Sequence, residues 1–440
     1  MIYKVGDFLI RSKEIIIIND DEYYRRVTVR MNHNGVVQRD EVLGSEIKTK
    51  RQYLVKAGQF IMSRIDARHG AFGIIPNELD GAIITGDFLA FDIDTDKINL
   101  EYFNDLIKSP KFLKFCIDGS TGTTNRKRLK EELFLTFEIE VPSKDKQDKI
   151  VDRIKAFKIE YVNLEAELKQ KEILVEKLKE SVLQNAIQGK LVQQDENDEP
   201  ASILLERIRL EKEQLIKEKK IKKEKSLPQI TDEEKLFEIP KGWEWGRLAD
   251  IARFIDYRGK TPKKVENGIP LITAKNIKFG YLTQEPREFI AEEAYNQWMT
   301  RGIPNFGDVI FTTEAPLGNV AQLNINYKYA LAQRAIVLSP FSTINKEYLK
   351  YVLMSNLIRQ VIFKKATGTT VLGIKGSKLK EVIIPIPSEN EQRRIVGKVN
   401  QLMALCNELA QTVEQSKQKS EKLMQTVLQE AFTVKEEVLN

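Results

Sequence analysis

The chain has 440 residues, 42% of them hydrophobic and 30% charged, with a formal net charge of +6. This length predicts two to four domains that are each large enough for a core, and the mildly basic balance permits nucleic-acid binding without requiring it. Two cysteines, Cys116 and Cys406, exclude a disulfide framework, while short apolar runs and the lack of an opening signal peptide favour a cytoplasmic protein without membrane spans.

Residues 1–143 are expected to form a strand-rich globule. Apolar or alternating runs at Phe60–Ser63 and Phe88–Ile93 are bounded by Gly and Asp, as short strands usually are. A helix is expected between about Leu100 and Cys116. Basic, turn-like loops lie on either side of this helix, and each one by itself is more typical of a solvated turn than of a binding site.

A long helix is expected over residues 144–188. Its apolar residues recur at alternating steps of four and three, which is typical of a coiled-coil seam. The predicted seam consists of Ile150, Ile154, Phe157, Tyr161, Leu164, Leu168 and Leu178. At about 1.5 Å per residue the helix is about 65 Å long, which is too long for one compact domain, so it requires a partner helix.

Residues 189–240 are expected to form a charged linker with its own helix from Ala201 to Lys225, which we interpret as solvated rather than bound to DNA. A second globule is expected over residues 241–387. Apolar runs at Ile269–Ile272 and Gly307–Phe311 predict strands in it. The second run resembles the strand at Phe60–Ser63 of the first globule, and both are followed by a glycine-containing loop.

A second long helix is expected over residues 388–433 and repeats the first with an offset of 245. Its predicted seam consists of Ile395, Val399, Leu402, Leu409, Val413 and Leu423, and Cys406 occupies a packing position between them. Ser388 is the expected N-cap, with Glu391 completing a capping box. Thr121–Thr124 also matches Thr367–Thr370. These offsets indicate an internal duplication, in the order globule, helix, linker, globule, helix.

Motifs for catalysis are absent from the sequence. The two histidines, His33 and His69, have no cysteine or histidine neighbours at metal-ligand spacing. No glycine-rich phosphate or dinucleotide loop is present, and no Asn-Pro-Pro or Asp-Pro-Pro tetrapeptide of an amino-methyltransferase occurs. We therefore expect a non-catalytic chain without a cofactor of its own.

Taken in order, these features resemble the specificity subunit of type I restriction–modification systems. The resemblance rests on Gly242–Trp245, Arg258–Pro262, Gly268–Ile272, Gln188–Val192, Asn197–Ala201, and on Gln147 and Gln392 at the entries to the long helices. It covers nearly the whole chain. The first half begins at Tyr3–Asp7 without the tryptophan-containing lead-in of the second, so its recognition domain is placed by resemblance from about Lys56 onward.

The resemblance implies an α+β fold with two target-recognition globules and a pseudo-two-fold, antiparallel coiled coil, although the seam alone allows parallel or antiparallel packing. It implies recognition of a bipartite, asymmetric site in double-stranded DNA. Two partner methyltransferase subunits carrying S-adenosylmethionine would methylate adenine, and restriction/translocase subunits using ATP and magnesium would cleave foreign DNA. The competing hypotheses are a coiled-coil scaffold whose globules bind proteins and an enzyme with an unrecognised site.

Basic, amide and threonine side chains in the loops are the candidate DNA contacts, since such groups pair with base edges or phosphates. In the first globule these are Arg64, Arg68, His69, Thr124, Asn125 and Arg126. In the second they are Arg258, Lys260, Lys263, Lys275, Asn276, Thr370 and Lys375.

Overall fold

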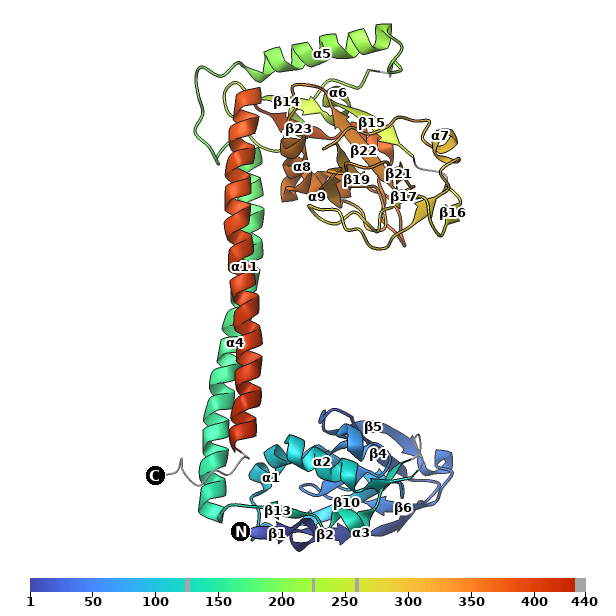
Figure 1. Cartoon of the computed structure of the whole chain (residues 1–440), viewed down its shortest axis with the longest axis vertical. Coiled ribbons are helices and arrows are strands. Elements are labelled where there is room, and N and C mark those ends of the chain that lie inside the picture. Colours follow the sequence, from blue (N-terminus) through green and yellow to red (C-terminus); the bar gives the residue numbers. More distant parts are fainter. Residues whose placement is uncertain (123–126, 224–225, 258–260, 432–440) are drawn as a thin grey trace. The chain divides into compact units, whose positions relative to one another are not determined.

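The computed structural model describes residues 1–122, 127–223, 226–257 and 261–431, and the chain divides into two units (Figure 1). Unit 1 consists of Met1–Lys169 and the C-terminal part of the chain from Glu414, and unit 2 consists of Gln170–Val413. Both long helices pass through the two units, so each unit contains one globule and a stretch of each helix.

The globule of unit 1 is a mixed α+β structure. Its strands are β1 (Ile2–Lys4), β2 (Leu9–Ser12), β3 (Ile15–Ile17), β4 (Tyr23–Val29), β5 (Val36–Leu43), β6 (Arg51–Leu54), β7 (Phe60–Ser63), β8 (Phe72–Ile74), β9 (Ile83–Ile84), β10 (Phe88–Ile93), β11 (Ser120–Thr121), β12 (Arg128–Leu129) and β13 (Glu138–Glu140). Its helices are α1 (Leu100–Leu106), α2 (Pro110–Asp118) and α3 (Glu131–Phe134).

Two main sheets form this globule. An antiparallel four-stranded sheet has the order β2-β10-β7-β8, and a five-stranded sheet has the order β3-β6-β9-β4-β5. A cluster of phenylalanines joins the first sheet to α1 and α2: the ring of Phe60 lies 5.3 Å from that of Phe103, and the ring of Phe72 lies 5.3 Å from that of Phe112. Edge-to-face ring pairs of this kind fix how the helices lie on the sheet.

The globule of unit 2 is built in the same way. Its strands are β14 (Glu244–Arg247), β15 (Ala252–Asp256), β16 (Lys264–Val265), β17 (Ile269–Ile272), β18 (Phe289–Ile290), β19 (Val309–Thr312), β20 (Val320–Gln322), β21 (Ala330–Leu331), β22 (Ala335–Pro340) and β23 (Ile383–Ile386). Its helices are α6 (Leu248–Ile251), α7 (Tyr295–Trp298), α8 (Lys346–Met354), α9 (Asn356–Lys364) and α10 (Gly376–Lys380). The linker helix α5 (Ala201–Lys217) buries Ala201, Leu204 and Ile208 in the core of this unit.

The sheet order of unit 2 repeats that of unit 1. Its four-stranded antiparallel sheet, β15-β22-β19-β20, matches β2-β10-β7-β8 strand for strand. The two-stranded pairs β1-β13 and β14-β23 also correspond. The second sheets differ, since the order β16-β18-β17-β21 replaces the five-stranded sheet. The common sheet therefore repeats, while the second sheet distinguishes the two globules.

The long helices are α4 (Lys144–Ile187) and α11 (Glu389–Ala431). In unit 2, Val182–Ile187 at the end of α4 share a core with Ile395–Val399 near the start of α11, so the two helices run antiparallel there. In unit 1, the charge of Glu421 on α11 helps to raise the pKa of Tyr161 on α4, after the larger effects of the Glu165 hydrogen bond and burial. The mixed α+β fold with two long helices confirms the predicted fold class.

The burial of the predicted seam is uneven. Most of its buried residues lie in one row of positions seven residues apart, namely Ile154, Leu168, Val175 and Val182 on α4 and Val399, Cys406 and Val413 on α11. Tyr161, in the same row of α4, is only half-buried. The alternate row differs from the prediction: Leu164, Leu178, Leu409 and Leu423 are 39%, 46%, 50% and 52% exposed. Two packed helices bury a narrow stripe, and these leucines lie at its border.

The remaining seam positions are intermediate or buried. Ile150, Phe157, Tyr161 and Leu402 are half-buried, whereas Ile395 is fully buried at the globule. Among the described residues, no helix combines the length and apolarity that crossing a bilayer requires.

Candidate functional site

The loop between β7 and β8 carries three predicted DNA contacts, Arg64, Arg68 and His69. The hydroxyl of Ser63 accepts a hydrogen bond of 3.1 Å from the backbone N–H of Asp66, which shapes the start of the loop. Nε of Arg68 donates to Nε2 of His69 at 3.1 Å. His69 is exposed and Arg68 half-buried, so this pair presents a donor-rich edge to solvent.

Arg64, the first residue of this loop, belongs to an ion-pair cluster with Arg11 and Glu131. Its Nη2 donates to Oε2 of Glu131 at 3.1 Å, and Nε of Arg11 lies 3.2 Å from Oε1 of the same carboxylate. Burial lowers the pKa of Arg11, and the Glu131 charge opposes this shift. Two guanidinium groups share one carboxylate, so the cluster retains one positive charge. Arg64 is thus suited to fixing the loop and attracting phosphate rather than to reading a base.

In the second globule, a cleft of about 370 Å³ brings together three loops. It is lined by Thr313, Glu314, Gln333, Arg334, Thr367, Val371, Gly373, Ile374 and Lys375. Nε of Arg334 lies 3.2 Å from Oε1 of Glu314, and the predicted contact Lys375 is exposed. The charged groups lining the cleft carry a net positive charge, which suits a phosphate. Thr370, also predicted, is exposed on the same loop as Lys375.

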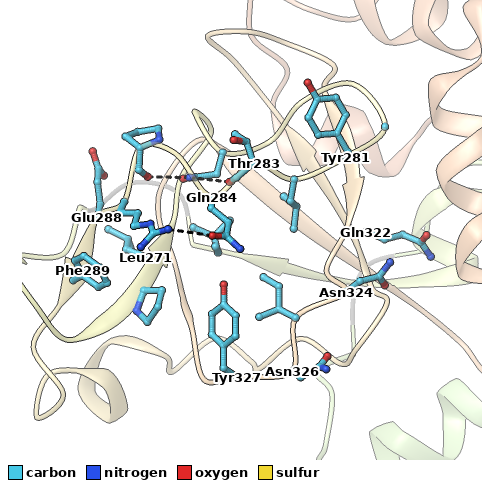
Figure 2. Close-up of a pocket in the computed structure, with 18 of the residues that line it drawn as sticks. Leu271, Tyr281, Thr283, Gln284, Glu288, Phe289, Gln322, Asn324, Asn326 and Tyr327 are labelled. Atoms are coloured by element: carbon cyan, nitrogen blue, oxygen red, sulfur yellow. Dashed lines mark hydrogen bonds between the residues drawn. The ribbon is translucent and has the colours of Figure 1, made fainter. Parts of the chain in front are cut away.

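A larger cavity of about 850 Å³ lies between the hairpin that follows β17 and the segment that follows β20 (Figure 2). Exposed Tyr281 and Tyr327 line it together with the carboxamides Gln284, Gln322, Asn324 and Asn326. In Figure 2 the ring of Tyr281 lies above Gln284 and that of Tyr327 below it. Nη2 of Arg287 donates to Oε1 of Gln284 at 3.3 Å.

The charged groups of this cavity are already paired. Glu288 lies 2.7 Å from Lys264, and Lys350 lies 3.1 Å from Glu347. A lining of tyrosines and carboxamides with balanced charge suits hydrogen bonding to neutral polar edges better than it suits phosphate. Sequence reasoning missed these residues, because they come from separate segments that carry no shared motif.

Asn276, one of the predicted DNA contacts, is buried in this structure. It lines the same cavity but is only 2% exposed, and its carboxamide forms hydrogen bonds within the hairpin. Oδ1 accepts from the backbone N–H and the hydroxyl of Thr273 at 3.0 and 2.8 Å, and Nδ2 donates to the carbonyls of Thr283 and Pro286 at 3.2 and 3.0 Å. These four bonds use both lone pairs of Oδ1 and both N–H groups of Nδ2, so Asn276 holds the shape of the hairpin in this structure.

The other predicted contacts lie apart from the cleft or outside the described residues. Lys263 precedes β16 and Lys275 follows β17, and both are exposed. Thr124, Asn125, Arg126, Arg258 and Lys260 lie outside the residues that the structure describes. Within the described ranges, His, Cys, Asp and Glu side chains form no group of three or more that could hold a metal ion.

Comparison with known proteins matches this architecture to one family. The model of the type I restriction modification DNA specificity domain matches twice, over residues 2–173 and 240–416. The chain belongs to this family. Each match contains one globule and part of the long helix that follows it, so the family's repeat coincides with the repeated sheet order.

Curated members of the family are similar over part of their length. The EcoAI specificity subunit of Escherichia coli is 29% identical over 378 residues, covering 74% of this chain and 63% of the relative. The EcoEI specificity subunit of Escherichia coli is 30% identical over 267 residues, covering 58% of this chain and 43% of the relative. The matches thus span less than two thirds of these relatives' length.

Solved structures of the family share the fold over nearly the whole chain. The HsdS subunit from Thermoanaerobacter tengcongensis is 18% identical with a TM-score of 0.56, covering 98% of this chain and 96% of that one. A chain from a structure on complex assembly and conformational transition of the type I R-M system is 18% identical with a TM-score of 0.61, covering 98% and 97%.

Proposed function

We propose that this chain is the DNA-recognition subunit of a type I restriction–modification complex in the cytoplasm. The observation that carries the proposal is the repeated four-stranded sheet, present in two globules whose second sheets differ. Membership of the specificity family supports it. Two related scaffolds with different loops suit two recognition acts on different sequences, that is, on the halves of a bipartite site.

In this proposal the loops divide the work of recognition. The positive cleft around Lys375 and the loop of Arg68 and His69 hold phosphates, which supplies affinity and register. The carboxamides of the larger cavity suit base edges, because Asn and Gln pair with N6 and N7 of adenine. The other described predicted contacts, Lys263, Lys275 and Thr370, remain candidates for either role.

The chemistry would belong to partner subunits. Two methyltransferase subunits with S-adenosylmethionine would methylate adenine, and restriction/translocase subunits with ATP and magnesium would cut unmodified DNA. The half-exposed leucines of α4 and α11 support docking of methyltransferase subunits on the helices, because a partner would cover apolar area that the helix pair leaves in solvent.

Mapping of methylated adenine tests the proposal. DNA would be taken from a host expressing this chain with its methyltransferase subunit, and the expected pattern is one split motif with a fixed gap. Exchanging either globule for that of a relative should change one half of the motif only. Methylation that is unchanged after exchange of both globules would favour the scaffold hypothesis, and methyl transfer by this chain alone would favour an enzyme.

A further inference from the structure

Each globule meets its long helix at a buried glutamine, Gln147 in unit 1 and Gln392 in unit 2. We call these two residues the joint glutamines. Both lie in the first turn of their helix, 1% and 0% exposed, and they occupy the same place in the internal repeat. Glutamine is mostly a surface residue, so two fully buried copies at equivalent joints require an explanation.

Gln147 connects three segments of unit 1. Its Oε1 accepts a hydrogen bond of 2.6 Å from the backbone N–H of Asn99, and its Nε2 donates to the carbonyls of Lys97 and Pro142 at 3.1 and 3.0 Å. Asn99 is the N-cap of α1, where its own side chain accepts from the backbone N–H of Glu101 at 2.8 Å. Gln147 thus connects α4 to the segment that starts α1 and to Pro142, which lies between β13 and α4.

Gln392 makes two of these three contacts in unit 2. Its Oε1 accepts from the backbone N–H of Asn345 at 2.7 Å, and its Nε2 donates to the carbonyl of Pro387 at 3.2 Å. Asn345 is the N-cap of α8, with its side chain accepting from Glu347 at 2.9 Å. The second sheets of the two globules differ, yet both joints share the bond from the N-cap backbone N–H and the bond to the proline carbonyl.

Other contacts at the two joints are not shared. In unit 1, Nζ of Lys158 lies 2.7 Å from Oδ1 of Asp105, whereas in unit 2 the hydroxyl of Tyr351 donates to Oδ1 of Asn400. Apolar contacts alone allow a helix to shift slightly against its neighbour, because they are non-directional. A buried carboxamide has fixed donor and acceptor directions and is costly to leave unpaired, so it selects one orientation.

We propose that the joint glutamines are positioning residues that set the orientation of each globule on its spacer helix, and thereby the number of base pairs that the complex accepts between half-sites. The inference rests on the proposed function as a DNA-recognition subunit. Without the joint bonds, each globule keeps the loops that read its half-site but adopts a range of orientations on its helix. Half-site preference is then retained while discrimination between gap lengths is lost.

The test uses Gln147→Met and Gln392→Met, which keep side-chain volume and remove the hydrogen bonds. The full chain with its methyltransferase partner is assayed on DNA carrying the native half-sites at the native gap and at gaps one base pair shorter and longer. We expect the variants to lose about tenfold in discrimination between gaps, the factor that corresponds to about one buried hydrogen bond. Gln170→Met and Gln411→Met, at exposed positions on the same helices, should leave discrimination unchanged.

A distance measurement tests the joint without DNA. Spin labels at Lys114→Cys and Asn163→Cys, both exposed in unit 1, report on the orientation of the globule relative to α4, since the native cysteines are buried. Gln147→Met should broaden the distance distribution, and Gln170→Met should not. If Gln147→Met does not fold, Gln147→Asn serves instead, because it keeps a carboxamide but shortens its reach.

The two proposals fail in different ways. A folded variant with a narrow distance distribution and unchanged gap discrimination would overturn the role of the joint glutamines while leaving DNA recognition intact. A wild-type complex that methylates no bipartite site would overturn the proposed function. In that case the spin-label distances would still decide whether the glutamine orients the globule.

Discussion

The indole Nε1 of Trp243 donates a hydrogen bond of 2.8 Å to Oε2 of Glu391, inside the core of unit 2. Gln194 donates to the other carboxylate oxygen at 2.6 Å. Burial raises the pKa of Glu391, and these two bonds oppose the shift. The carboxylate of Glu391, in the first turn of α11, therefore connects this helix to Gln194 of the linker and to Trp243, the residue before β14.

Trp243→Phe removes the donor while keeping an aromatic ring. We expect a loss of about 1–3 kcal/mol in the free energy of unfolding, because a buried carboxylate oxygen loses its partner. Urea unfolding of the full chain measures it. In the Glu391→Gln background, which removes the charge, the same change should cost less. Equal costs in both backgrounds would mean that the charge of Glu391 does not strengthen the bond.

The ion pair of Asp198 with Arg394 should make the free energy of unfolding depend on pH. Its Oδ2 accepts from Arg394 at 2.6 Å and from Ser388 at 3.0 Å, and the hydrogen bond from Arg394 is the main cause that holds the pKa of Asp198 below its usual value of 3.8. The pKa of Asp198 is lower in the folded than in the unfolded protein. Its contribution to the free energy of unfolding is therefore fully present above the unfolded pKa and is lost as pH falls through the folded pKa.

We therefore expect Asp198→Asn to lower the free energy of unfolding by about 1 kcal/mol at about pH 6, a modest value because Arg394 is partly exposed to solvent. The difference between wild type and variant should shrink below about pH 4. Urea unfolding across this range measures it. A difference that is constant with pH would assign the effect to packing instead.

Leu168 and Leu164 provide a matched pair on α4. Leu168 is 3% exposed and Leu164 is 39% exposed. We expect Leu168→Ala to cost about 2–4 kcal/mol of unfolding free energy, because it leaves a cavity, and Leu164→Ala to cost less than about 1 kcal/mol in the isolated chain. Thermal or urea unfolding measures both. Similar costs would show that the helix pair buries both rows equally.

Lys375→Ala should weaken DNA binding uniformly across sequences. An exposed lysine in a positive cleft that holds a phosphate contributes affinity without sequence information, so the salt dependence of binding should fall by about one unit of slope. Binding titrations on specific and nonspecific duplexes at several salt concentrations measure this. Arg209→Ala, whose side chain pairs with Glu206 on α5, serves as the control of equal charge change. A loss confined to the specific duplex would make Lys375 a base reader.

The periodic parts of the molecule could be predicted from the sequence. Alternating steps of four and three imply a long helix with an apolar stripe, and the recurrence of that stripe at an offset of 245 predicts a second helix in register with the first. Which row of the stripe is buried could not be predicted, because Leu168 and Leu164 are the same residue type. Only the position of the partner helix separates them.

Polar side chains were less predictable than apolar ones. Ser388 does accept the backbone N–H of Glu391 at 3.0 Å, as expected of an N-cap, but both carboxylate oxygens of Glu391 are taken by Trp243 and Gln194 instead of closing a capping box. The side chain of Asn276 is likewise buried and bonded within its hairpin. A polar residue can bond to any neighbour that the fold supplies, and those neighbours lie far away in the sequence.

The place of the second sheets suggests how such a chain acquires new targets. In both globules the second sheet takes most of its strands from one segment of the chain, which lies between β2 and β7 in unit 1 and between β15 and β19 in unit 2. One further short strand, β9 or β21, lies just before β10 or β22. The divergent part is therefore almost one continuous piece of the gene on each side. Recombination near residues 13–58 or 257–307 would exchange most of a second sheet in one event, including in unit 2 the hairpin side of the larger cavity, and would leave the helices and their joints untouched. Under the proposed function, such an exchange would change the target in a single step.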